Sequence, residues 1–143
     1  MTPLARKIAG LLTPLSDFYD SAGAPAPGVE PVAGAKVPQP YHGLLVHSND
    51  MTPTLESYWK QRIHLRILGL RRTEQEIFRQ VVLITDDTDQ PVAFGAIRIQ
   101  LDRLPESARA LVAQGQRPLG RILHDQKIPH SSQTKQWRQF SRV

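Results

Sequence analysis

The alternation of apolar and polar positions is clearest between residues 78 and 101. Two runs rich in valine and isoleucine, 81–84 and 92–101, flank the polar segment 86–91. Branched side chains favour extended backbone, whereas clustered aspartates and a proline favour turns. The pattern therefore predicts an antiparallel hairpin whose loop is longer than a two-residue turn.

Arg79 interrupts an apolar stripe of the first arm of this hairpin. It has the same parity as Ile77, Val81 and Leu83, so it is expected to face the covered side of the sheet. A charge facing a core needs a partner or a ligand. In the second arm the apolar positions change parity next to Gly95, which predicts a β-bulge there.

The N-terminal part of the chain differs in composition from the rest. Apolar residues at roughly helical spacing over 4–19 predict an amphipathic helix within residues 1–20. Residues 21–40 consist mainly of alanine, glycine and proline, which is typical of a flexible linker. We therefore predict a globular domain over residues 41–143.

Short helices and strands without alternating strand–helix units favour an α+β domain with an antiparallel sheet and helices packed over it. Asp50 or Thr52 is the expected cap of a helix near residue 53, and Tyr58 is expected to pack inward. The other expected elements are a strand at 62–70, a helix at 105–114, a short helix entered by the loop 116–123, and a last strand at 137–143.

Charge and composition exclude several classes of site. The net charge of +5 arises entirely in residues 117–143, which could bind an anion or nucleic acid, although a solvated basic end is the simpler interpretation. The absence of cysteine excludes disulfides, thiolate catalysis and cysteine–metal sites. No apolar run is long enough to span a membrane, and we take the cytoplasm as the default location.

Most catalytic and metal-binding motifs are missing. The five histidines show no ligand spacing, and there is no GxSxG, Walker loop or GxGxxG. The segment Pro118-Leu119-Gly120-Arg121 could place backbone N–H groups beside a carboxylate, with the Arg79 guanidinium on the other side. The alternative is a packed turn with an arginine ion-paired to an acid. On the residues alone we favour the packed turn.

Four short segments, in this order, resemble the chorismate lyase family. They are Asp50-Met51-Thr52, the strand 78–83 with Arg79, the return strand 91–95 with Gly95, and 117–123 with its PLGR sequence. The resemblance spans about residues 42–124. It implies an antiparallel sheet of about six strands with helices over a buried pocket, and cleavage of chorismate to 4-hydroxybenzoate and pyruvate without a cofactor.

The resemblance also implies roles for individual residues. Arg79 would be the catalytic residue that pairs with the aromatic carboxylate, Leu119 and Gly120 would bind the same ligand through the backbone, and Met51 would line the pocket. The family also has a glutamate on a late strand, whereas the last glutamate of this chain is Glu106.

Three functional hypotheses remain open at this stage. The chain is a lyase acting on an enolpyruvyl ether, a protein of the same fold that only binds an aromatic or other carboxylate, or an anion- or nucleic-acid-binding module that uses the basic C-terminal tail. We rank the last hypothesis lowest, because only Trp137 and Phe140 are interleaved with the basic residues of the tail. The oligomeric state is not predicted.

Overall fold

The fold is built on a three-stranded antiparallel sheet. A computed structural model of the protein describes residues 14–25 and 28–140, with side chains described up to residue 138. Strands β2 (Ile63–Arg72), β3 (Glu76–Thr85) and β4 (Pro91–Gln100) lie in the order β2-β3-β4. The predicted hairpin and the strand before it are therefore confirmed.

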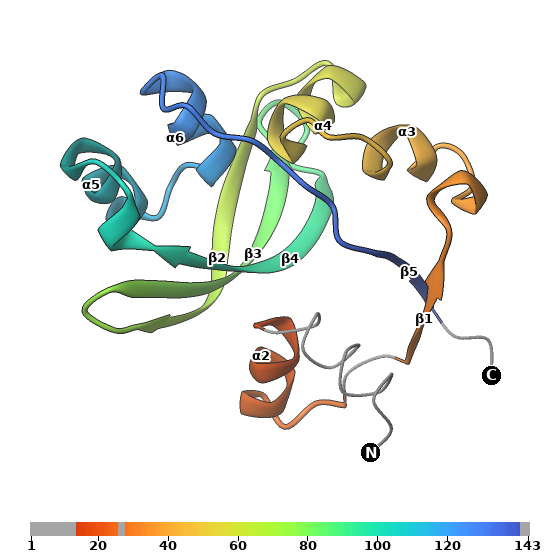
Figure 1. The fold of residues 1–143 in the computed structure, drawn as a ribbon, viewed down its shortest axis with the longest axis horizontal. Coiled ribbons are helices and arrows are strands. Elements are labelled where there is room, and N and C mark those ends of the chain that lie inside the picture. Colours follow the sequence, from red (N-terminus) through yellow and green to blue (C-terminus); the bar gives the residue numbers. More distant parts are fainter. Residues whose placement is uncertain (1–13, 26–27, 141–143) are drawn as a thin grey trace.

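Helices cover one face of this sheet, as expected for an α+β fold (Figure 1). They are α4 (Met51–Trp59), α5 (Glu106–Gln114) and α6 (Leu119–Asp125), and a 3₁₀ turn η2 (Leu101–Arg103) leads from β4 into α5. Gly115 ends α5 in the left-handed conformation, with φ of 70°. The expected stop signal is confirmed.

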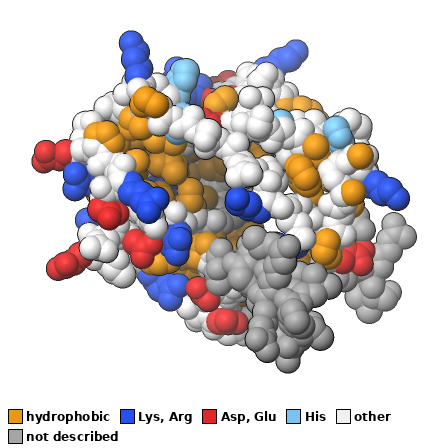
Figure 2. Space-filling model, in the orientation of Figure 1, with side chains coloured by type: hydrophobic (Ala, Val, Ile, Leu, Met, Phe, Trp, Pro, Cys, Tyr) orange, Lys and Arg blue, Asp and Glu red, His pale blue; other side chains and the backbone are white. Residues whose placement is uncertain are grey.

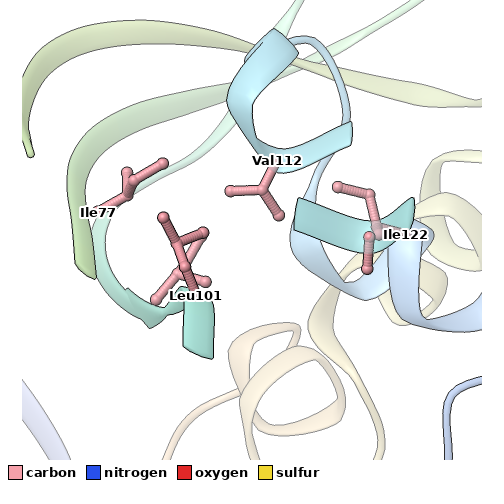
Figure 3. Close-up of a cluster of buried hydrophobic side chains, with 6 residues drawn as sticks. Ile77, Leu101, Val112 and Ile122 are labelled. Atoms are coloured by element: carbon pink, nitrogen blue, oxygen red, sulfur yellow. The ribbon is translucent and has the colours of Figure 1, made fainter. Parts of the chain in front are cut away.

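The core lies between the sheet and these helices. Ile77 on β3 and Leu101 on η2 point toward Val112 on α5, with Ile122 on α6 beside them (Figure 3). Ala108 and Ile122 are completely buried. This core fixes the two helices α5 and α6 over one end of the sheet.

The opposite face of the sheet carries α2 (Leu15–Ser21). Phe18 is 7% exposed, and its ring lies against the backbone of Gly69, where a Cβ atom would be only 2.9 Å away. Tyr19 makes an edge-to-face contact with Phe94, with ring centroids 6.5 Å apart. Most of the expected N-terminal helix, residues 1–13, lies outside the described residues.

The expectation of a single sheet of about six strands is wrong, because in the part of the chain that the structure describes the main sheet has three strands and a second sheet has two. β1 (Val29–Val32) pairs antiparallel with β5 (Trp137–Phe140), so five strands are present in the described residues, divided between two sheets. The last strand was expected correctly, but it joins β1 and not the main sheet. The 3₁₀ turn η1 (Gly34–Lys36) and the helix α3 (Tyr41–Leu45) follow β1.

The segment predicted to be a flexible linker therefore contains β1 and η1. Val37, directly after η1, is 9% exposed. Val29 and Val32 of this segment pair with Phe140 and Trp137 of β5. The local composition cannot reveal this pairing, because β5 is distant in the sequence. The division into a helix, a linker and a domain stays a prediction.

Two further local expectations are wrong. Gly95 pairs regularly with Val81, and the register shifts lie instead between Ile67 and Gly69 and between Leu83 and Ile84. Tyr58 is 49% exposed, because the inward face of α4 is formed by Thr52 and Leu55.

Candidate functional site

Arg79 is the most unusual side chain of the described structure. It is 2% exposed and faces the helices together with the other odd-numbered residues of β3, as its parity predicts. Its Nη2 donates to the carbonyl oxygen of Arg117 at 3.3 Å, but Nε and Nη1 are buried without a partner. The guanidinium therefore keeps unused donors in the interior.

No carboxylate among the described residues compensates this charge. Glu76, one partner expected for a structural arginine, forms its ion pair with Arg98 at 3.3 Å, and none of the other ion pairs includes Arg79. Burial lowers the pKa of Arg79, but a guanidinium stays protonated at neutral pH. A fixed positive charge thus lies in an environment of low polarity.

Small residues on β4 leave space beside Arg79. Val81 and Leu83 on β3 pair with Gly95 and Ala93 on β4, so the side-chain layer is thin at these positions. A Cβ atom added to Gly95 would meet nothing within 4 Å. The sequence forms a gap here because two successive positions on this face of β4, Ala93 and Gly95, have almost no side chain.

This gap is part of a cavity of about 480 Å³, which we call the Arg79 cavity. Figure 2 shows hydrophobic side chains gathered in a hollow on the side of the view where α5 and α6 lie. Most residues lining the cavity are apolar, and the charged or polar ones come from β3, from α4 and from the segment after α6. The lining residues that bear on the site are Asp50, Met51, Thr52, Arg79, Gly95, Leu119, Gly120, His130, Ser131 and Ser132.

All site residues expected from the sequence line this one cavity. Arg79 comes from β3, Met51 begins α4, and Leu119 and Gly120 form the first turn of α6. A Cβ atom on Gly120 would lie 3.3 Å from the Thr52 Oγ1 atom, so the glycine allows α6 to approach α4 closely. Whether these residues bind a ligand stays a prediction.

The PLGR segment has features of both interpretations given above, the carboxylate-binding loop and the packed turn with an ion-paired arginine. Arg121 forms an ion pair with Glu56 on α4, and the other carboxylate oxygen of Glu56 accepts a hydrogen bond from the Ile63 backbone N–H at 3.0 Å. Arg121 is thus the arginine paired to an acid, and it connects α6 to α4. Arg79, which the packed-turn interpretation would also have paired, has no such partner.

A second polar group in the cavity wall was missed from the sequence. Asp50 occupies the N-cap position of α4, as expected, but its side chain caps nothing. Its carboxylate accepts hydrogen bonds from Ser132 Oγ at 2.6 Å and from His130 Nε2 at 2.5 Å. These residues are about 80 positions apart, and no spacing rule connects them.

Asp50, His130 and Ser132 form a hydrogen-bonded cluster in which the pKa values of Asp50 and His130 are shifted. The hydrogen bonds from Ser132 and His130 lower the pKa of Asp50. The Ile128 carbonyl, which accepts from Nδ1 at 2.8 Å, and the Asp50 carboxylate raise the pKa of His130. Each shift favours the charged form of its group, so the contact in the cavity wall favours an anionic Asp50 and a cationic His130.

Other features of the described residues offer less chemistry. A shallow depression of about 610 Å³ between α3 and α4 is lined only by uncharged residues. No group of three or more histidines and acids in residues 14–25 and 28–140 is arranged to hold a metal ion. None of the helices described is both long and apolar enough to cross a bilayer.

Comparison with protein-family models, with curated proteins and with solved structures finds no match for this chain. Any function must therefore be inferred from the residues that line the Arg79 cavity.

Proposed function

We propose that this protein binds an aromatic carboxylate in the Arg79 cavity, as a chorismate-lyase-like protein. The observation that carries the proposal is the buried guanidinium with unused donors facing an otherwise largely apolar cavity. A planar carboxylate matches this fork and neutralises its charge, while an aromatic ring fits the apolar walls. The resemblance in residues 42–124 supports the same ligand class.

The cavity volume is within the range of small-molecule sites. Sites for small molecules usually measure about 300–1,000 Å³, and the Arg79 cavity has about 480 Å³. Met51 and Leu119 provide apolar contacts, and the backbone at Leu119 and Gly120 is close enough to take part in binding the ligand. In this proposal Arg79 supplies orientation and most of the polar affinity.

The main test compares arginine variants by calorimetry with benzoate and 4-hydroxybenzoate. A charge-assisted hydrogen bond contributes about 1.5–3 kcal/mol, so Arg79→Ala should weaken binding roughly ten- to a hundred-fold. Arg79→Lys should recover part of the loss, because an ammonium restores the charge without the planar fork. Benzamide, which is uncharged, should bind the wild type much more weakly than benzoate.

Arg98→Ala provides the matched control. Arg98 also lies in the main sheet, but it pairs with Glu76 and does not line the Arg79 cavity. Its removal should leave affinity for benzoate unchanged. The proposal is wrong if the wild type binds neither carboxylate, or if it binds both as tightly as Arg79→Ala does.

Lyase activity is the narrower form of the proposal. In it the chain cleaves chorismate to 4-hydroxybenzoate and pyruvate, with Arg79 holding the ring carboxylate. The chain has no glutamate after Glu106 to match the late-strand glutamate of the family, and Asp50 is the only carboxylate lining the cavity in the described residues. Incubation with chorismate and measurement of pyruvate separates an enzyme from a protein that binds without turnover.

The nucleic-acid hypothesis gains little support from the structure. Of the basic residues in the tail, Arg121 is neutralised by Glu56, and two guanidinium nitrogens of Arg138 are buried. Filter binding to DNA and RNA at several salt concentrations should therefore give weak affinity.

A further inference from the structure

The segment between α6 and β5 forms part of the wall of the Arg79 cavity. We call residues 129–134 the strap. Figure 1 shows this dark-blue connection leaving α6 and passing α4 on its way to β5. His130, Ser131 and Ser132 of the strap line the cavity. The strap therefore forms one side of the cavity, and its displacement would open that side.

Few interactions hold the strap. In the part of the chain that the structure describes, no backbone group of residues 129–134 makes a hydrogen bond to another backbone group outside the strands. Among the described residues, the side-chain hydrogen bonds from the strap to distant parts of the chain are those of Ser132 and His130, which both donate to Asp50, and a long one of 3.5 Å from Thr134 to the His47 carbonyl. Two of these three hydrogen bonds therefore end on one carboxylate, that of Asp50.

The geometry at His130 requires a particular protonation state. Nδ1 faces the Ile128 carbonyl oxygen, which can only accept, so Nδ1 carries a hydrogen. A neutral ring protonated at Nδ1 would turn the lone pair of Nε2 toward the Asp50 carboxylate, and two acceptors would face each other. The short contact between Nε2 and Asp50 is favourable only when both ring nitrogens are protonated.

The charged groups around this contact come from four elements. Asp50 is the N-cap residue of α4, and His130 belongs to the strap. His124 on α6 lowers the pKa of Asp50 through a Coulombic interaction. Arg79 on β3 lines the same cavity. Asp50 is the only acid lining the cavity among the described residues. Loss of the charge on His130 or on Asp50 would thus remove the ion pair without a substitute.

We propose that the strap is a pH-dependent gate of the Arg79 cavity, latched when the His130 imidazolium binds the Asp50 carboxylate and loosened when either group loses its charge. Its role in ligand entry rests on the function proposed above, whereas the latch itself is a property of the free protein. The proton lost from Nε2 goes to solvent, and no other reactant is involved.

The direction of the pH response follows from the two shifts. The pKa of His130 is raised, so the latch is complete at lower pH and is lost as the pH rises through this elevated value. The pKa of Asp50 is lowered, so the latch is also lost as the pH falls through that depressed value. The gate is closed between the two.

A spin label on the strap tests the latch without any ligand. The chain has no cysteine, so Gln133→Cys provides a single attachment site at an exposed position of the strap. Electron paramagnetic resonance should show a restricted nitroxide between the two pKa values and a mobile one above that of His130. With Asp50→Asn in the same background, the mobile fraction in the pH range where the wild-type label is restricted should rise roughly three- to ten-fold, and its pH dependence should disappear.

Asp86→Asn is the matched control. Asp86 contacts His64 Nδ1 at 2.6 Å, so the substitution removes a carboxylate–histidine contact of the same kind away from the cavity. It should leave the label restricted. Nuclear magnetic resonance titration gives a second readout, in which Asp50→Asn lowers the pKa of His130.

The proposal is overturned if Asp50→Asn leaves both the label mobility and the His130 titration as in the wild type. It is also overturned if Asp86→Asn mobilises the label as much as Asp50→Asn does. Because neither measurement uses a carboxylate ligand, failure of the proposed binding function and failure of the latch are distinguishable.

Discussion

At the scale of single residues, the burial of Arg79 is unfavourable for the stability of the protein without a ligand. Its guanidinium is 2% exposed, and two of its three nitrogens have no hydrogen-bond acceptor. An unsatisfied buried donor costs about 1–3 kcal/mol, and an unpaired charge costs more. A residue kept at this cost is typical of a binding site that a ligand completes.

This cost predicts that Arg79→Met stabilises the protein without ligand. Methionine has a similar length and no polar group to desolvate, so the free energy of unfolding should rise by about 1–2 kcal/mol and the melting temperature by about 3–6 °C. Calorimetric melting gives both quantities. A lower melting temperature for Arg79→Met would show instead that Arg79 has a structural role through Arg117.

Ligand should reverse this order of stability. Binding to the folded state alone stabilises by about 2.7 kcal/mol at a concentration one hundred times the dissociation constant. Benzoate should therefore raise the melting temperature of the wild type and not that of Arg79→Met.

At the scale of elements, the hairpin shows what a local pattern can predict. Parity placed Arg79 with Val81 and Leu83, and all three line the cavity. The prediction of a bulge next to Gly95 was wrong, because apolar residues occur on both faces of β4 although its pairing with β3 is regular from Ala93 to Gln100. Phe94 faces Tyr19 of α2 while Gly95 faces the cavity, so apolar residues of both parities occur without a slip in register.

A larger side chain at Gly95 should fill part of the cavity without destabilising β4. Its backbone has no left-handed φ, and a Cβ atom would enter open space. Gly95→Val should keep or slightly raise stability, since a branched residue favours a strand more than glycine does. It should weaken benzoate binding roughly ten-fold or more by occupying the ligand volume.

A graded series makes this test sharper. Gly95→Ala adds one carbon atom and should have a smaller effect on calorimetric affinity than Gly95→Val. Equal affinity in all three proteins would place the ligand outside the Arg79 cavity.

At the scale of the whole molecule, long-range pairing was beyond sequence reasoning. The fold class and the helix α5 with its stop at Gly115 could be predicted, because each depends on local periodicity or on a short motif. The residues expected to form a site line one cavity, and their role in binding stays a prediction. The contact of Asp50 with His130 and Ser132, and the pairing of β1 with β5, join segments that only the complete fold brings together. No periodicity within either segment encodes the other.

Deletion of the first 40 residues tests how much they contribute to the free energy of unfolding. From composition alone, their deletion should leave the domain intact. In the structure Phe18 is buried against Gly69, Val37 is buried, and β1 pairs with β5. Burying a side chain of this size contributes about 1.5–3 kcal/mol, so deletion of residues 1–40 should remove several kcal/mol from a total of about 5–15.

Melting curves of the full chain, the deletion and two point variants of α2 test this prediction. Phe18→Ala should lower the stability by about 2–4 kcal/mol, because the ring leaves a cavity over Gly69. Asp20→Ala, on the exposed side of the same helix, should change the stability by less than about 0.5 kcal/mol. If the deletion melts at the temperature of the full chain, α2 and β1 contribute nothing and the domain begins near residue 41. The alternative outcome is a lower melting temperature for Phe18→Ala and for the deletion, with no change for Asp20→Ala. In that case α2 is part of the folded unit and supports the sheet from the side opposite to the Arg79 cavity.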